Sequence, residues 1–398
     1  MLHPNLIIIT CVVFISSTIV SSSIIHSLED CYKNIPPRTE IFLTISSLYS
    51  FYTKNGMVQR WLEVNWVTET LLKDDIIHVY NKDPTQDPTL RPLLTVDPKK
   101  YSKGYFRTNI MIPVNKSFLN PEEENTCMGY WAIYRNAKGE HESSTCLKIH
   151  PFWMEHTSKQ ISSLRLHEIM IPGSHDSGSF SRKKKTYPFT RYKYAQELSI
   201  FNQLVYGLRY FDLRIGYYKQ TKDKYFINHN FLLTDHTVKS ILEQIIAIIF
   251  TIFFPSSSEI WQSGKNVIVS YDYKFRNGTP AYLWPRIPRA WGNKQNLESL
   301  KTYFQEVFSK PTPQGLWAAM AEMTPNVRMI LFQPFNGLRN MADKVNREVT
   351  HWFRDLYWQK TNIIATDYFL GNDIINVAIR ANKMKGVCPR SFWSHLKI

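Results

Sequence analysis

The chain has 398 residues, of which 43% are hydrophobic and 14% aromatic, and this composition excludes an intrinsically disordered protein. The net charge of +15 is unevenly distributed: residues 24–155 carry 15 Lys or Arg against 16 Asp or Glu, whereas residues 156–398 carry 33 against 17. The excess predicts an anionic partner for the second part, with a generally basic secreted protein as the alternative. Nucleic acid is disfavoured, because no recognised nucleic-acid-binding motif accompanies the charge.

The first 23 residues resemble a secretory leader. Residues 6–20 are largely apolar, three serines follow at positions 21–23, and the first charged side chain is Glu29. Because the apolar stretch is short for a membrane span and is interrupted by small polar residues, we expect a signal peptide at 1–23, with a membrane anchor as the alternative. The protein is therefore expected to be secreted.

Four cysteines follow the leader, an even number that suits disulfides in an oxidising compartment. Cys127 and Cys146 flank a turn-like Asn-Ala-Lys-Gly segment, so a disulfide across a hairpin is their preferred pairing. Cys31 and Cys388 then remain for a second bond, although four cysteines allow three pairings. Two sequons for N-glycosylation begin at Asn115 and Asn277.

Residues 24–155 predict a small all-β, sandwich-like domain. Short stretches in which apolar and polar residues alternate are separated by Pro, Asp, Asn and Gly. The expected strands are 41–49, 60–67, 75–82, 102–110, 128–136 and 143–151.

Residues 156–398 alternate strand-like and helical stretches, which predicts a parallel sheet or a (β/α) barrel. The expected strands are 168–172, 208–215, 225–228, 267–272, 327–333 and 362–366, and the expected helices are 296–309, 341–358 and 373–383. The apolar run at 245–254 is too short for a membrane span and is interpreted as a buried helix of the barrel.

Three of these segments place polar residues at the ends of strands: Ile-Pro-Gly-Ser-His-Asp-Ser at 171–177, Gly-Leu-Arg-Tyr-Phe-Asp-Leu-Arg at 207–214 and Asn-His-Asn at 228–230. In a (β/α) barrel such strand ends meet in one pocket. Two histidines, two aspartates and an arginine suit phosphodiester chemistry, with one imidazole as base, the other as acid and the guanidinium on the phosphoryl oxygens. Taken singly, each residue is also compatible with a structural role.

In this order the three segments resemble the X domain of phosphatidylinositol-specific phospholipase C, as found in PI-PLC X domain-containing proteins and secreted bacterial enzymes. The segment Ile-Ile-Ala-Thr-Asp-Tyr at 363–368 is similar as well, and the leader followed by a β domain resembles secreted arthropod members. The resemblance implies a distorted, incompletely closed TIM-type (β/α) barrel at 156–398.

The resemblance also implies roles for individual residues. His175 matches the general base that deprotonates the inositol 2-hydroxyl, and Asp367 matches the aspartate that orients it. His229 matches the general acid for the diacylglycerol oxygen, and Asp176 matches the carboxylate paired with that acid. The implied products are diacylglycerol and inositol 1,2-cyclic phosphate.

Arg214 matches the phosphate-binding arginine, with Asp212 in the neighbouring acidic position. Arg214 stands where calcium-dependent relatives have a metal ligand, and a guanidinium would repel a cation, so neither a metal nor another cofactor is expected. Asp272 or Lys274 is expected to contact the inositol ring. The strand expected at 327–333 lacks the ring-contacting arginine of the family, which leaves the head-group specificity open.

The expected partner is a phosphoinositide or a glycosylphosphatidylinositol-type lipid at a membrane surface, with no obligate protein partner. Four basic residues at 182–185, followed by aromatics at 187, 189, 192 and 194, suit an anionic interface; a solvated loop is the alternative. Two other functions are kept open: a lipid phosphodiesterase for glycerophosphodiesters or sphingomyelin, and a catalytically silent lipid- or glycan-binding module.

Overall fold

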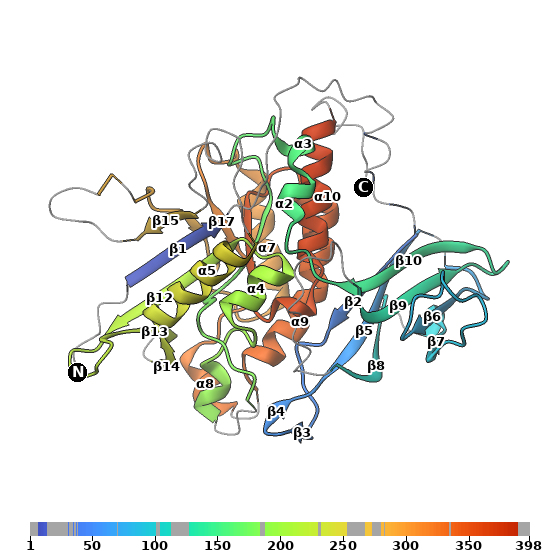
Figure 1. Ribbon diagram of the computed structural model, residues 1–398, viewed down its shortest axis with the longest axis horizontal. Coiled ribbons are helices and arrows are strands. Elements are labelled where there is room, and N and C mark those ends of the chain that lie inside the picture. The colour runs from blue at the N-terminus through green and yellow to red at the C-terminus, as the bar shows by residue number, and fades with distance from the viewer. Residues whose placement is uncertain are drawn as a thin grey trace.

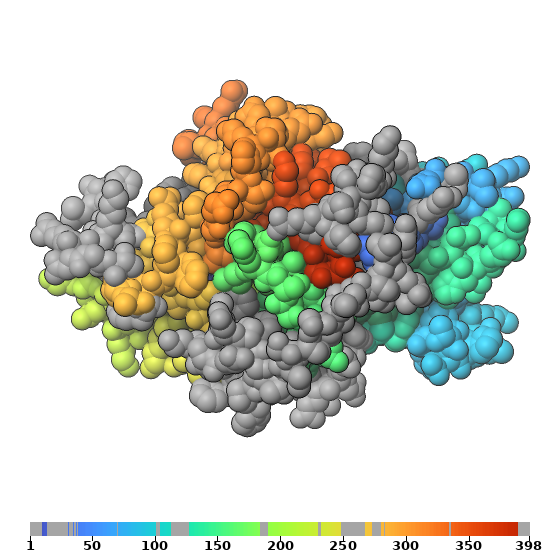
Figure 2. Space-filling model, turned by 90° about the horizontal axis from the view of Figure 1, so that it is seen from above, coloured from blue at the N-terminus to red at the C-terminus, as the bar shows by residue number. Residues whose placement is uncertain are grey.

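The computed structural model describes residues 7–13, 31, 35, 37, 39–69, 71–100, 104–112, 127–183, 188–229, 232–252, 267–272, 280–281, 283–333 and 336–388. A β-rich part formed by the earlier residues lies beside a larger part that mixes strands and helices, as the two perpendicular views show (Figures 1 and 2). No helix in these residues is long and apolar enough to cross a membrane.

The β-rich part consists of two antiparallel sheets and a short hairpin. One sheet contains β2 (Thr39–Ile45), β5 (Arg60–Thr68) and β8 (Tyr105–Ile112), and the other contains β10 (His141–Lys148), β9 (Cys127–Arg135), β6 (Ile76–Tyr80) and β7 (Leu94–Val96). The hairpin pairs β3 (Thr53–Lys54) with β4 (Met57–Val58). Each of the six strands predicted here overlaps an observed strand.

The hairpin turn is fixed by Asn55 and Gly56, which have positive φ angles of 52° and 72°. Asn and Gly are the residues that adopt this conformation most readily, and an Asn-Gly pair is the strongest short signal for a tight hairpin. Phe51 and Tyr52 therefore precede a well-defined turn at the tip of the β-rich part.

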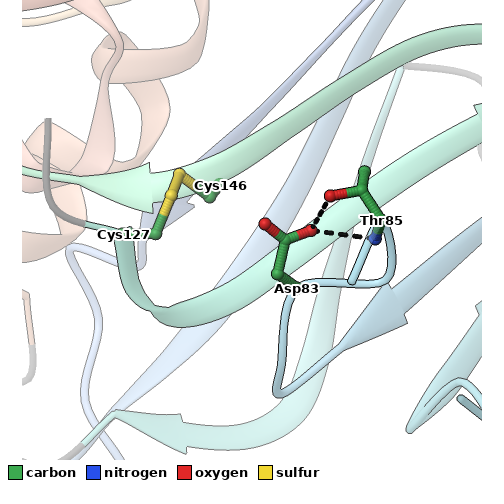
Figure 3. The surroundings of a disulfide bond; sticks show 4 residues. All are labelled: Asp83, Thr85, Cys127 and Cys146. Atoms are coloured by element: carbon green, nitrogen blue, oxygen red, sulfur yellow. Dashed lines mark hydrogen bonds between the residues drawn. A yellow bond between two sulfur atoms is a disulfide. The ribbon is translucent and has the colours of Figure 1, made fainter. Parts of the chain in front are cut away.

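The preferred pairing of Cys127 with Cys146 is confirmed, and the structure also shows the second bond, which the sequence left open. Cys127 and Cys146 join β9 to β10, next to a turn in which the Asp83 carboxylate accepts hydrogen bonds from the backbone N–H and the hydroxyl of Thr85 (Figure 3). Cys31 is joined to Cys388, which directly follows the last helix.

The mixed part is built on a curled sheet. Its path of strands is β14 (Leu232–Thr237), β13 (Tyr225–His229), β12 (Tyr210–Tyr217), β11 (Ile171–Ser174), β18 (Ile363–Thr366), β17 (Ala318–Met320) and β16 (Arg289–Ala290). The five strands from β12 to β16 along this path are parallel, so their carboxyl ends meet at one edge. By contrast, β13 and β14 add an antiparallel hairpin beyond β12.

Helices accompany this sheet (Figure 1): α4 (Ile200–Tyr206), α5 (Val238–Ile252), α7 (Leu297–Ser309), α8 (Val327–Phe332), α9 (Leu338–His351) and α10 (Ile374–Val387). The expected helices at 296–309, 341–358 and 373–383 correspond to α7, α9 with the π-helix Trp352–Leu356, and α10. The run at 245–254 lies largely in α5, but that helix is not fully buried, because Leu242 and Ile246 are exposed. Residues 253 and 254 lie outside the described residues.

The strand predicted at 327–333 is wrong, because this segment is α8. The side chain of Asn326 caps the helix by accepting a hydrogen bond from the backbone N–H of Met329 at 2.9 Å. A short apolar run fits a strand and a helix equally well, and the cap decides in favour of the helix. The sheet takes the short strand β17 at this point in the chain instead.

Ile7–Val13, within the predicted signal peptide, forms β1 and pairs antiparallel with both β12 and β15 (Val267–Tyr271). In this register Thr10 lies opposite Asp212, and Ile8 lies opposite Arg214. A leader that is removed cannot keep this place, so full-length and cleaved chains must differ along β12. The signal peptide stays a prediction, and its expected cleavage site at 21–23 lies outside the described residues.

Candidate active site

The first motif forms a tight connection between two strands of the curled sheet. A Cβ atom on Gly173 would lie 2.7 Å from the Cβ of Tyr210, so glycine is what allows β11 and β12 to approach this closely. Asp176 has a φ of 40°, a left-handed conformation that turns the chain directly after β11. His175 and Asp176 are consequently held, buried, at the carboxyl edge of the sheet.

His175 contacts a carboxylate with one ring nitrogen and a guanidinium with the other. Its Nδ1 lies 2.7 Å from Oδ1 of Asp367, which follows β18, and its Nε2 lies 2.5 Å from Nη2 of Arg214 on β12. Since a guanidinium only donates hydrogen bonds, this geometry corresponds to the neutral ring, with the proton on Nδ1 and with Nε2 accepting from Arg214, the form that is populated above the pKa of His175, about 9.

His229, at the end of β13, faces the first histidine. The two ring centroids lie 6.3 Å apart with their planes at 82°. The Nδ1 atom of His229 lies 4.0 Å from Oδ2 of Asp176. Three separate strands therefore bring both predicted histidines and their two aspartates into one cluster.

Asp212 and Arg214 project from the same face of β12. Arg214 Nη2 lies 3.2 Å from Oδ2 of Asp212, and the backbone N–H of Asp176 donates to that same oxygen at 3.3 Å. Burial opposes ionisation of Asp212, but Arg214, His175 and Arg289 outweigh it and lower the pKa of this carboxyl. Asp212 is therefore a fixed negative charge beneath the guanidinium of Arg214.

Burial and charge set the proton affinities of the two histidines in opposite directions. Burial works against a charged His175, but Glu322 and Asp367 favour it and raise its pKa to about 9, despite Arg214. For His229, burial together with the positive charges of Arg214 and His175 lowers the pKa to about 3. Burial raises the pKa of Asp176 to about 8, so the proton of the His229–Asp176 pair resides on the carboxyl in the free site.

The chain was compared with known proteins. No family model matches it. It is 25% identical over 303 residues to PI-PLC X domain-containing protein 1 of Homo sapiens, a match that covers 60% of this chain and 94% of the relative. It is also 24% identical over 308 residues to PI-PLC X domain-containing protein 2 of Mus musculus, covering 58% of this chain and 87% of the relative. Over about 60% of its length the chain is therefore similar to PI-PLC X domain-containing proteins.

Two residues of this site were missed by the sequence analysis. Glu322 is buried, with Oε1 3.8 Å from Nε2 of His175. Arg289 lies with Nη1 3.6 Å from Oδ1 of Asp212 and with Nη2 2.8 Å from Oδ2 of Asp272. Arg289 begins the two-residue strand β16 and Glu322 follows the three-residue strand β17, so the only local signal was a polar residue beside a very short apolar run.

Of the two residues expected to contact the inositol ring, the structure describes Asp272 but not Lys274. Asp272 follows β15 and is held by Arg289 and by Arg286, whose Nε lies 2.7 Å from Oδ1 of Asp272. This arrangement connects Asp272 to the site through Arg289. Lys274 lies outside the described residues, as do Asn115 and Asn277, the two expected glycosylation sites.

Several buried polar atoms of the site accept or donate no hydrogen bond within the described part of the chain. They are both carboxylate oxygens of Asp176 and Glu322, Oδ1 of Asp212, Nδ1 of His229 and the hydroxyl of Tyr210. Buried polar groups are usually satisfied, because leaving one unpaired costs about 1–3 kcal/mol. Unpaired groups gathered in one cluster with shifted pKa values are typical of a site that receives a ligand.

Among the described residues, no group of three or more His, Cys, Asp or Glu side chains is arranged to hold a metal ion. The positive charge beside Asp212 comes from Arg214 and Arg289. The metal-free site inferred from the sequence stays a prediction, and the test with a chelator is described below.

Proposed function

We propose that this chain is a phosphodiesterase of the phospholipase C type, which cleaves phosphatidylinositol-type lipids to diacylglycerol and an inositol cyclic phosphate without a metal. The observation that carries the proposal is the placement of two facing histidines, each beside its own aspartate, with the guanidinium of Arg214 against one of them. A base, an acid and a fixed cation are what an in-line phosphoryl transfer between two oxygens needs.

In the proposed reaction, Nε2 of His175 accepts the proton of the inositol 2-hydroxyl, and the freed oxygen attacks phosphorus. The bond between phosphorus and the diacylglycerol oxygen breaks, and that oxygen takes a proton from His229. The proton is supplied by the pair that His229 forms with Asp176. Throughout the reaction Asp367 accepts a hydrogen bond from the Nδ1–H group of His175. The proton therefore stays on Nδ1, and Nε2 is available as the base.

Arg214 changes partner when substrate binds. In the free site its Nη2 donates to the atom of His175 that serves as the base. A phosphodiester anion offers a stronger acceptor for a guanidinium than a neutral imidazole does, so Arg214 turns to the phosphoryl oxygens and releases Nε2. Arg289 adds a second positive charge on the side of Asp272. We assign Arg289 and Asp272 to contacts with the head group of the lipid.

The same proposal includes the domain architecture and the secretion of the protein. The curled sheet with its helices supports an incompletely closed TIM-type barrel at 156–398, and the two antiparallel sheets support a sandwich-like domain at 24–155. The two disulfides are of the kind that oxidising compartments favour, which supports a secreted protein whose leader is removed.

The test is turnover in excess EDTA. The purified protein is incubated with phosphatidylinositol, phosphatidylcholine, sphingomyelin and a glycerophosphodiester, and the products are followed by phosphorus NMR. We expect cleavage of phosphatidylinositol alone, with a cyclic phosphate as the first product and none formed by the His229→Ala variant. Cleavage of a choline lipid, or no cleavage of any substrate, would contradict the proposal.

A further inference from the structure

The most exposed large apolar side chains of the described residues are concentrated in two segments. Phe51 and Tyr52, before the β3–β4 hairpin, are 82% and 77% exposed, and Phe332 and Val327 of α8 are 75% and 71% exposed. Leu331 of α8 is 53% exposed as well. Isolated exposed apolar residues are common, but four of this size with so little cover in two short segments call for an explanation.

These two segments belong to one edge of the molecule, although they come from different parts of the chain (Figure 1). The hairpin is joined to the loop after the first motif, because the backbone N–H of Val58 donates to the carbonyl of Arg182 at 2.9 Å. On the other side, the hydroxyl of Tyr192 donates to the carbonyls of Met329 and Gln333 at the end of α8. The 177–196 segment thus connects hairpin and helix.

A cavity of about 390 Å³ lies between the residues before the hairpin, the connecting segment and the start of α9, which follows α8 in the chain. Its wall includes Phe51 from the β-rich part, Lys183 and Arg191 from the connecting segment, and Asn336 and Gly337 after α8. We call the surface formed by residues 46–59, 177–183, 188–196, 323–333 and 336–342 the docking edge.

The docking edge adjoins the candidate active site. The side chain of Gln196 donates to the backbone carbonyl of His175 at 2.9 Å, and the hydroxyl of Tyr368 donates to the carbonyl of Tyr194 at 2.5 Å. Tyr368 directly follows Asp367, the partner of His175. The docking edge is therefore in direct contact with the backbone that carries His175 and Asp367.

The charge of the docking edge is of one sign. Its residues include seven Lys or Arg and no Asp or Glu, and Lys54, Lys183 and Arg328 are exposed. Tyr192 and Tyr194, which the sequence analysis placed at an aromatic rim, are buried, so that expectation is wrong for both. The exposed aromatic rings come from Phe51, Tyr52 and Phe332 instead.

We propose that the docking edge binds the surface of an anionic phospholipid bilayer, with Phe51, Tyr52 and the apolar side chains of α8 inserted among the lipids and the cations at the head groups. Separate protruding rings surrounded by positive charge fit a fluid anionic interface better than they fit the flat, continuous patch of a protein interface. This rests on the proposed function only in that the substrate is a membrane lipid. It gives the β-rich part a role, because Phe51 and Tyr52 belong to it.

The binding test uses the His229→Ala variant, so that the lipid is not consumed. Flotation with vesicles of phosphatidylcholine, with and without phosphatidylserine, is measured for this protein, for Phe51→Ser/Phe332→Ser added to it, and for Leu356→Ser added to it. Leu356 is a matched control, since it is 59% exposed but lies outside the docking edge. We expect binding only to the anionic vesicles, weakened about tenfold or more by the double change and unaffected by the control.

Activity of the otherwise native enzyme separates docking from chemistry. Phe51→Ser/Phe332→Ser is expected to leave kcat/KM on a monomeric short-chain phosphatidylinositol unchanged and to lower turnover on anionic vesicles about tenfold. Equal vesicle binding by the double variant and the control would overturn the proposal, and so would binding of an acidic protein but not of vesicles. If vesicle binding behaves as expected while no substrate is cleaved, the docking edge stands and the proposed function fails.

Discussion

Buried charges in this molecule occur in two clusters that differ in how they are satisfied. Around the boundary between the β-rich part and the mixed part, buried and half-buried side chains form a network of close ion pairs. The pairs are Arg60 with Glu197, Arg339 with Glu197, Arg107 with Glu63 and Asp343, Arg347 with Asp343, and Arg354 and Arg380 with Glu40. Around His175, by contrast, neither Asp176 nor Glu322 accepts a hydrogen bond from the described residues.

The difference separates a structural role from a binding role. Paired charges between the two parts hold them in one relative position. Removing one member of a pair leaves the other as a buried charge without a partner, which is strongly destabilising. Around His175, Glu322 and Asp176 have only distant histidine partners, at 3.8 and 4.0 Å, and accept no hydrogen bond from the described residues. Such carboxylates lower the stability of the free protein and are ready to contact a ligand. The same kind of substitution is therefore expected to have opposite effects in the two clusters.

The largest effect is expected from the two histidines of the site. His175→Ala and His229→Ala should each lower kcat on phosphatidylinositol by about 10²–10⁴-fold, because each removes a proton-transfer group. The midpoint of urea unfolding should stay the same or rise. His351→Ala, in α9, serves as the control that keeps activity. Near-full activity of either site variant would remove the role assigned to that histidine.

Arg214→Lys should lower the rate by about 10²-fold, because an ammonium group lacks the two-pronged geometry that a guanidinium offers to phosphoryl oxygens. The same substitution at Arg347, which pairs with Asp343 of the same helix, α9, at 3.1 Å, should leave the rate unchanged. Wild-type activity should persist in excess EDTA. Loss of activity in EDTA with recovery on adding calcium would end the metal-free mechanism.

Glu197→Gln should lower the free energy of unfolding by about 3–5 kcal/mol, because Arg60 and Arg339 lose the carboxylate that both contact. Burial already lowers the pKa of Arg60 to about 9, which shows how little solvent compensates its charge. Urea unfolding followed by tryptophan fluorescence measures the loss. An unfolding midpoint equal to that of the wild type would mean that these ion pairs do not hold the two parts together.

The matched change Glu322→Gln should instead raise the free energy of unfolding at pH 8–9, by an amount on the order of 1 kcal/mol. Burial raises the pKa of Glu322 to about 8, above its value in the unfolded chain. The neutral carboxyl thus favours the fold at low pH, and this contribution is lost as the pH rises through about 8. Glutamine stays neutral and avoids the loss. A lower midpoint for Glu322→Gln at this pH would show that Glu322 is a structural residue.

The pH profile of kcat/KM tests whether Glu322 influences the protonation of His175. The base must be neutral and the acid pair must keep its proton, but the pKa of His175, about 9, lies above that of Asp176, about 8. Only a minor fraction of the enzyme then has both groups in their active forms, so activity should rise with pH to about 8, stay level, and fall above about 9. Glu322→Gln removes a charge that favours protonated His175 and should move the rising limb to lower pH. A rising limb that does not move would show that Glu322 has no influence on the base.

The sequence predicted the parts of the site that depend on local signals. His175, Asp212 and His229 lie in or directly after strands whose apolar pattern is visible within a few residues. The fold then brings these strands together. Glu322 and Arg289 could not be found in this way, because β17 and β16 exist only through pairing along the sheet to β18.

Two segments show where local pattern is ambiguous. The apolar run of α8 was predicted as a strand, and the Asn326 cap, a single side-chain contact, decides its form. The run Ile7–Val13 has the composition of a leader and also that of a buried strand, and in the full-length chain it takes the place between β12 and β15. Apolar composition alone does not distinguish a signal peptide from a buried strand of the fold.

The Cys31–Cys388 disulfide, with a sequence separation of 357 residues, makes both parts of the molecule members of one covalent ring. A protease that cuts the backbone once anywhere inside this ring produces a nicked molecule whose two pieces stay attached. The ring also closes late, because Cys388 must have left the ribosome before it reaches Cys31, whereas Cys127 and Cys146 are available much earlier. Reduction, rather than the cut itself, is the step that would release a fragment.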